Sequence, residues 1–206
     1  MTILATNTTP RVGDIIFTRW PELSSRVTCA LTGDRGKAGR AAHQEMIDNV
    51  CAAEGPRVLA ASAEKGKMKR WTWPGRKDYF SETKTEWSRW TRLRPFLPAE
   101  TEQIQFEAEK QFNMFSYSKS ELPLQGIDAI RARILGLHPE EPEAIWARKL
   151  GDWWKGGVIC SKAGNLPFIR IKIFPDYSRF WSPSDTYRYI DSGVSGWGLA
   201  EHTPGW

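Results

Sequence analysis

One cysteine lies in a segment suited to chemistry, residues 153–164, which reads Trp-Trp-Lys-Gly-Gly-Val-Ile-Cys-Ser-Lys-Ala-Gly. Two glycines let the backbone pass closely, and two apolar residues lead to Cys160 where a helix can begin. The positive end of a helix dipole favours a thiolate, as do the nearby Lys155 and Lys162. The segment predicts a nucleophile; the alternative is that Cys160 is one more small buried hydrophobic residue, as most free cysteines are.

The composition indicates one globular domain spanning residues 1–206. Hydrophobic residues make up 40% and charged residues 26% of the chain, a balance that is typical of folded proteins. A net charge of +5 favours an anionic partner, such as cell-wall polymer, lipid or nucleic acid. The basic residues are scattered and no nucleic-acid-binding motif is visible, so nucleic acid is the weaker candidate. The eleven tryptophans indicate packing, or else a groove for sugars or bases.

The cysteine count bears on metals and redox state. Cys29, Cys51 and Cys160 include no C-x-x-C pair, which indicates a reducing compartment rather than a disulfide framework. A zinc site of Cys29, His43 and Cys51 would match no common ligand spacing, so we expect neither a metal nor a cofactor. We also expect no signal peptide and no transmembrane segment, hence a protein that is cytoplasmic or delivered by another route.

Hydrophobic periodicity predicts a series of strands followed by helices. Strands are expected over residues 12–18, 68–73 and 87–94, with a hairpin formed by 41–48 and 57–62, although the first arm would also suit a helix. Helices are expected over 24–30, 98–113, 127–135 and 143–150. After Cys160, residues 169–173 alternate as a strand does, residues 182–187 open like a capped helix, and the glycines of the C-terminal segment indicate a loop-rich end.

Several of these segments, taken in order, carry a family resemblance. They are Gly-Asp-Ile-Ile-Phe at 13–17, Ala-His-Gln at 42–44, Leu-Arg-Pro at 93–95 before a helix, and Cys-Ser at 160–161. Over residues 12–191 the chain resembles the circularly permuted NlpC-type (YiiX-like) cysteine hydrolases of the papain-like superfamily. The resemblance implies an α+β fold in which an antiparallel sheet packs against helices, and in which the strand with the histidine precedes the helix with the cysteine.

The resemblance also implies roles for individual residues. Cys160 matches the nucleophile of the family and His43 its general base, so that a thiolate would attack an acyl carbon while the imidazole transfers the proton. Tyr117 lies where the family has a Gly-x-x-Tyr segment. Ser-Pro-Ser-Asp at 182–185 matches a Ser/Thr-Pro-x-Asp element near the C-terminal end.

The chain departs from the family pattern in three places. The family's third catalytic group, usually a Glu that orients the histidine, falls at Ala60, with Ser62, Glu64 or a backbone carbonyl as substitutes. Gly164, Asn165 and Pro167 interrupt the segment that is an apolar helix in the family, and residue 42 is Ala rather than Ser.

Two functions are consistent with these patterns. The first is a cysteine-dependent hydrolase of an amide or ester, such as a peptidoglycan peptide or a lipid acyl group, with Cys160 and His43 as its dyad. The second is a papain-fold binding protein that has lost catalysis and holds a ligand on a basic, tryptophan-rich surface. His138 and His202 have no motif around them, and Cys29 and Cys51 are expected to be structural. The small size would suit a bacterial or phage protein.

Overall fold

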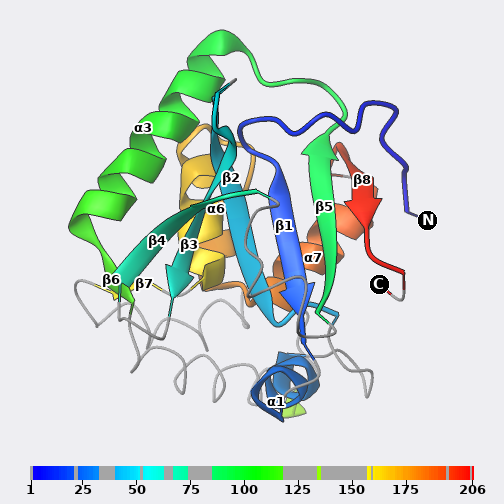
Figure 1. The fold of residues 1–206 in the computed structure, drawn as a ribbon. Helices are drawn as coiled ribbons and strands as arrows, with labels where there is room; N and C mark the ends of the chain where they lie inside the picture. The colour runs from blue at the N-terminus through cyan, green and yellow to red at the C-terminus, as the bar shows by residue number, and fades with distance from the viewer. Residues whose placement is uncertain are drawn as a thin grey trace.

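The computed structural model describes residues 2–20, 23–32, 40–51, 53–62, 67–73, 85–117, 134–135, 157–158, 160–193, 195–204 and 206. Among these residues, eight strands form one sheet: β1 (Ile15–Arg19), β2 (His43–Cys51), β3 (Gly55–Ser62), β4 (Lys67–Thr72), β5 (Glu86–Arg92), β6 (Ser116–Tyr117), β7 (Gly157–Val158) and β8 (Trp197–His202). Their order is β7-β6-β4-β3-β2-β1-β5-β8, and only the short β6–β7 pair is parallel (Figure 1).

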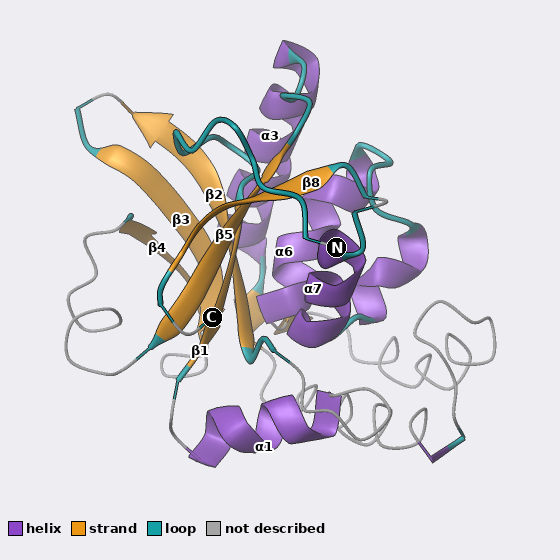
Figure 2. Ribbon diagram, turned by 90° about the vertical axis from the view of Figure 1, so that its right-hand side faces the viewer, coloured by secondary structure: helices purple, strands orange, loops and turns teal. Residues whose placement is uncertain are grey.

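Along the described chain, the helices lie between groups of strands. They are α1 (Leu23–Thr32), α3 (Pro98–Met114), α6 (Cys160–Arg170) and α7 (Pro183–Asp191), with a 3-10 helix η2 (Asp176–Phe180) between the last two. Helices α6 and α7 lie on the same side of the sheet, and α1 lies beyond the end at which β1 finishes (Figures 1 and 2). The expected α+β class is therefore present.

The alternation of side chains along β1 divides the core into two parts. Ile15 and Phe17 belong to the larger cluster, which includes Phe168 of α6, whereas Ile16 belongs to a smaller cluster on the opposite face. Because β1 pairs with both β2 and β5, it is a central strand that is buried on both faces. This burial explains the continuous apolar run that predicted it.

An ion pair inside the sheet connects β1 with β5. Asp14 immediately precedes β1, and its Oδ2 accepts a 2.6 Å hydrogen bond from Arg89 in β5; both side chains are 1% exposed. The same carboxylate accepts a 3.1 Å bond from the backbone N–H of Arg11. Such a pair leaves a buried charge without compensation if one partner is removed. The acidic residue of the Gly-Asp-Ile-Ile-Phe segment thus has a structural role.

Most elements expected from periodicity are present in the structure. The strands near residues 12–18, 68–73 and 87–94 correspond to β1, β4 and β5, and the hairpin is formed by β2 and β3. The helices near 24–30 and 98–113 correspond to α1 and α3. The helices expected at 127–135 and 143–150 lie outside the described residues, apart from residues 134–135.

Two expectations for the C-terminal third were wrong. The segment 169–173 is not a strand, because α6 continues to Arg170 and ends in a Schellman motif: Lys172 has φ 59°, and the N–H of Ile173 donates to the carbonyl of Phe168 at 2.9 Å. The alternating isoleucines pack at the edge of the core instead. The C-terminal segment is not loop-rich throughout, because turns with positive φ at Gly193 and Gly196 lead into β8, which pairs with β5.

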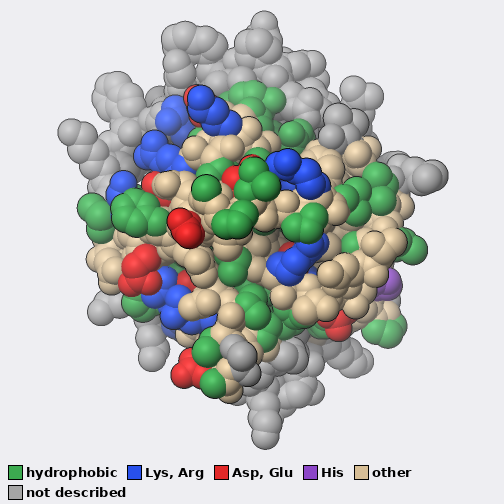
Figure 3. Space-filling view, turned by 90° about the horizontal axis from the view of Figure 1, so that it is seen from above, with side chains coloured by type: hydrophobic (Ala, Val, Ile, Leu, Met, Phe, Trp, Pro, Cys, Tyr) green, Lys and Arg blue, Asp and Glu red, His purple; other side chains and the backbone are tan. Residues whose placement is uncertain are grey.

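The described surface bears on the expected anionic partner. On the face seen in Figure 3, basic side chains lie in separate groups among hydrophobic and neutral ones rather than in one continuous field. Of the eight described tryptophans, four are buried (Trp73, Trp90, Trp181, Trp197) and four are half-buried (Trp20, Trp71, Trp87, Trp206). Within the described ranges, tryptophans therefore build the core and its margins. No helix among these residues is long and apolar enough to cross a membrane.

Candidate active site

Cys160 is the first residue of α6 and follows closely after β7 at the edge of the sheet. Its side chain is 7% exposed and belongs to the main core cluster. The N–H groups of the first turn of a helix have no intrahelical acceptors, and the positive end of the dipole lies there. The sulfur thus occupies the helix N-terminus that the sequence indicated.

His43 is the first residue of β2, opposite Thr18 in the β1–β2 ladder. Contacts with α7 and with Trp20 help to hold this end of the strand. The hydroxyl of Ser184 in α7 donates to the carbonyl of Ala41 at 2.8 Å, and the edge of the Trp20 ring lies against the imidazole, with ring centroids 6.0 Å apart. Ser184 belongs to the Ser-Pro-Ser-Asp segment, so that motif fixes the chain two residues before the histidine.

The structure brings Cys160 and His43 together, although 117 positions separate them in the sequence. Burial alone would raise the pKa of the Cys160 thiol. The charge of His43 and a hydrogen bond from its ring oppose burial, and the backbone N–H groups of Gln44 and Ser161 also bond to the sulfur. The net pKa of Cys160 lies below its ordinary value of 9.0. This arrangement favours a thiolate beside an imidazolium.

A carboxylate that sequence reasoning missed also contacts the histidine. Nε2 of His43 lies 3.2 Å from Oε1 of Glu45, whose side chain is 1% exposed. Ala60 is buried in β3, as expected, but its lack of a polar group does not leave the imidazole without a partner. The side chain of Ser62 and the whole of Glu64 lie outside the described residues. Among the described side chains, the carboxylate beside the imidazole thus comes from the histidine's own strand, β2.

The residues expected to interrupt α6 lie inside it. The helix runs through Gly164, Asn165 and Pro167, all of which are buried. The Asn165 amide donates to the carbonyl of Ser178 at 2.8 Å and to the hydroxyl of Thr186 at 2.9 Å. Its oxygen accepts a 2.8 Å bond from Gln44. Asn165 thus joins α6 to η2, α7 and the strand that carries His43.

Gly164 allows this helix to approach β2 closely. A Cβ atom at position 164 would lie 2.4 Å from Nε2 of Gln44, a distance that ordinary contacts do not reach. Gln44 is fully buried and its backbone N–H bonds to the Cys160 sulfur. The glycine therefore helps to bring Cys160 and the strand that carries His43 together.

The other residues matched to the family pattern, Tyr117 and the segment 182–185, lie in β6 and at the start of α7. Tyr117 lies in β6, which pairs with β7 just before Cys160, although its side chain is not among those described. Ser182 caps α7: its hydroxyl accepts from the N–H of Asp185 at 3.2 Å, and the Asp185 carboxylate accepts from the N–H of Ser182 at 2.9 Å. This capping box confirms the expected capped helix.

The other cysteines and histidines lie elsewhere. Cys29 is buried in α1, and Cys51 is exposed at the end of β2. Because β2 is nine residues long, Cys51 lies roughly 26 Å along the strand from His43, so the two cannot share one ion. No cluster of three metal-ligating side chains occurs in the described part of the chain. His202 is exposed at the end of β8, and His138 is outside the described residues.

Neither the family models nor the curated proteins with which the sequence was compared match this chain.

Proposed function

We propose that this protein is a cysteine-dependent hydrolase of the circularly permuted NlpC-type, papain-like family, acting on an amide or ester bond. Cys160 is its nucleophile and His43 its general base and acid. The proposed substrate class is an acyl compound such as a peptidoglycan peptide or a lipid.

The order of elements supports the family assignment. The strand with His43 precedes the helix that begins with Cys160, and α3 follows β5 after the Leu-Arg-Pro segment. The strands β1, β2, β3 and β5 pair in antiparallel fashion, and α6 packs against β2 and β3. This is the order that the permuted family would require.

The single observation that carries the proposal is the contact between the Cys160 thiol and His43 at the start of α6. A structural cysteine gains nothing from an imidazole partner, and burial alone would make it a poor nucleophile. Here the interactions that favour the thiolate outweigh burial. A thiol held in this state is what acyl transfer needs.

The proposed reaction has two steps. The Cys160 thiolate attacks the carbonyl carbon, and collapse of the tetrahedral intermediate breaks the C–N or C–O bond while His43 protonates the leaving group. Water then attacks the thioester, His43 accepts its proton, and the carboxylic acid and free thiol are released. The N–H groups of the first turn of α6, which have no intrahelical acceptors, stabilise negative charge near the sulfur in both steps.

An acyl-enzyme assay tests the proposal. The wild-type protein is incubated with p-nitrophenyl acetate at neutral pH, p-nitrophenol release is followed, and intact-mass spectrometry detects acetylation. We expect turnover and an acetyl adduct that peptide mapping places on Cys160. Cys160→Ala should abolish both, whereas Cys51→Ala, at the exposed end of β2, should change neither. Equal release by wild type and Cys160→Ala, with no adduct, would refute the proposal.

A further inference from the structure

The carboxylate of Glu45 is buried against the histidine of the proposed dyad. Its side chain is 1% exposed, and Oε1 lies 3.2 Å from Nε2 of His43. Among the described residues, neither carboxylate oxygen has a partner with hydrogen-bond geometry, and the imidazole is the group with which Glu45 forms an ion pair. A carboxylate is rarely buried unless it is paired. The imidazole of His43 therefore compensates the buried charge of Glu45, and the contact can serve the histidine as well as the fold.

The strand geometry explains how these two side chains meet. Residues two apart in a strand project from the same face, so His43 and Glu45 are neighbours along β2. The β2–β3 register pairs Met46 with Leu59, and continuing it by one residue places Ala60 opposite Glu45. Ala60 is 1% exposed and has no side chain beyond Cβ. The small residue on β3 leaves room for the carboxylate on β2.

We propose that Glu45 is the positioning residue for His43, and that it supplies from the histidine's own strand the carboxylate that the permuted family carries on the neighbouring strand. The catalytic consequence of this assignment rests on the proposed function. Because Nε2 faces Glu45, Nδ1 is the nitrogen left to exchange a proton with Cys160. In this role the Glu45 carboxylate lies beside Nε2, so it favours the tautomer with the proton on that nitrogen and stabilises the imidazolium that forms when Nδ1 takes a second proton.

The surroundings of the pair support a positioning role. The Trp20 ring makes an edge contact with the imidazole, and the side chains of His43 and Glu45 are only 12% and 1% exposed, so water competes little for the Nε2 hydrogen. A buried charge of this kind acts on its neighbour more strongly than an exposed one. The carboxylate therefore restricts the ring to one orientation and favours its charged form.

The experiment compares four variants by two measurements that need no substrate. Alkylation of Cys160 by iodoacetamide at pH 7 reports the thiolate, and the ¹⁵N signals of His43 in a Cys160→Ala background report the tautomer of the ring. Glu45→Leu removes the carboxylate, Glu45→Gln keeps an acceptor without charge, and Glu45→Ala with Ala60→Glu moves the carboxylate to β3. Glu107→Gln, which alters a buried carboxylate on α3, is the matched control.

We expect Glu45→Leu to slow alkylation by about tenfold or more, because an opposite charge at this distance shifts such equilibria by at least one pH unit. Its His43 signals should change from the Nε2-protonated tautomer to a mixture. Glu45→Gln should keep the tautomer but slow alkylation, the relocated carboxylate should recover most of the rate, and Glu107→Gln should match the parent.

Unchanged alkylation and unchanged ¹⁵N signals in folded Glu45→Leu would overturn the inference. If Glu45→Leu does not fold, an alkylation rate in Glu45→Gln equal to that of the parent overturns it. Failure of the proposed function would be seen separately, as the absence of an acetyl adduct on wild-type Cys160.

Discussion

Replacing Gly164 by alanine should disturb both the stability of the fold and the reactivity of Cys160. The new Cβ would lie 2.4 Å from Nε2 of Gln44, so either α6 or the Gln44 side chain must move by about an ångström to reach ordinary contact. Neither can move freely. Gln44 is fully buried and donates to Asn165 at 2.8 Å, and Asn165 is itself bonded to Ser178 and Thr186.

The magnitude follows from two contributions. Overpacking a filled core costs about 1–3 kcal/mol. Breaking the bond between Gln44 and Asn165 leaves buried amide groups unsatisfied, which costs a further ~1–3 kcal/mol. The free energy of unfolding of Gly164→Ala should therefore fall by about 2–6 kcal/mol, a large part of the ~5–15 kcal/mol of a typical domain.

Urea denaturation followed by tryptophan fluorescence measures this loss, and iodoacetamide alkylation at pH 7 measures the effect on the thiol. Because the Gln44 backbone N–H bonds to the sulfur, displacement of β2 should also slow alkylation. The double variant Gly164→Ala with Gln44→Ala is the control, since removing the Gln44 side chain relieves the contact and should make the two effects less than additive. A Gly164→Ala protein as stable as the parent, or strictly additive effects, would refute the reasoning.

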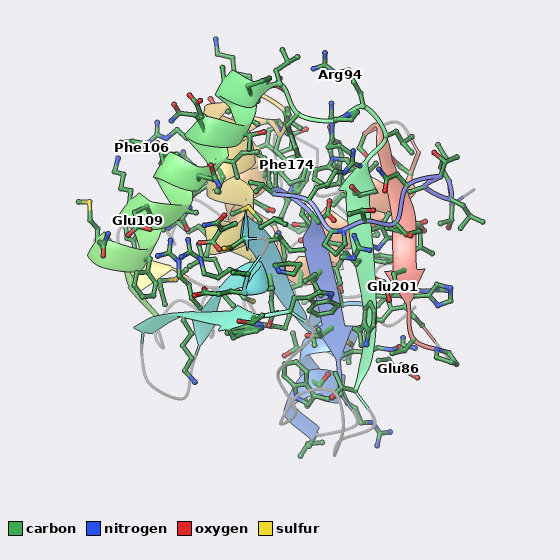
Figure 4. All side chains as sticks on the ribbon, turned by 45° about the horizontal axis from the view of Figure 1, so that its top comes forward. Glu86, Arg94, Phe106, Glu109, Phe174 and Glu201 are labelled. Carbon is green, nitrogen blue, oxygen red and sulfur yellow. The ribbon has the colours of Figure 1, made fainter. Side chains whose placement is uncertain are left out.

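Two further predictions concern the elements that hold the site. Arg89→Met leaves the buried Asp14 carboxylate without its oppositely charged partner and should lower the free energy of unfolding by about 3–5 kcal/mol in urea titrations. Arg94→Ala, which removes a guanidinium that is 65% exposed and projects beyond β5 (Figure 4), should cost no more than ~1 kcal/mol; equal losses would contradict the assignment. Ser184→Ala removes the bond to the Ala41 carbonyl and should lower stability by about 1 kcal/mol and slow alkylation of Cys160. Unchanged alkylation would show that α7 does not position the histidine.

Local patterns predicted most of the elements because burial has a different period in strands and helices. The apolar run of β1 and the i, i+4 spacing within α3 are both explained by the faces they bury. The strand predicted at residues 169–173 was wrong because alternating isoleucines also occur where a helix ends in a left-handed residue at the edge of the core. The decisive bonds there, from Ile173 to Phe168, form only once α6 is in place.

The candidate site was predictable in part. Cys160 and His43 were indicated by their neighbours in the sequence, but Glu45 was not. Side chains two residues apart lie on the same face of a strand but not of a helix. The sequence around His43 was compatible with either a strand or a helix. Once that segment is assigned to β2, His43 and Glu45 must share a face, which was the available signal. The role of Asn165 had no such signal, because its partners come from three separate elements.

The pH dependence of Cys160 alkylation tests the central claim most directly. The thiolate forms above the pKa of the thiol, which His43 and the two backbone N–H groups hold below 9.0 against the effect of burial. The rate of iodoacetamide alkylation in the Cys29→Ala, Cys51→Ala background should therefore reach half its maximum below pH 9.0. His43→Ala removes the main interaction that lowers the pKa of Cys160, so the midpoint of the alkylation profile should move to higher pH. A midpoint at or above 9.0 that is the same with and without His43 would contradict the claim that Cys160 is an activated nucleophile.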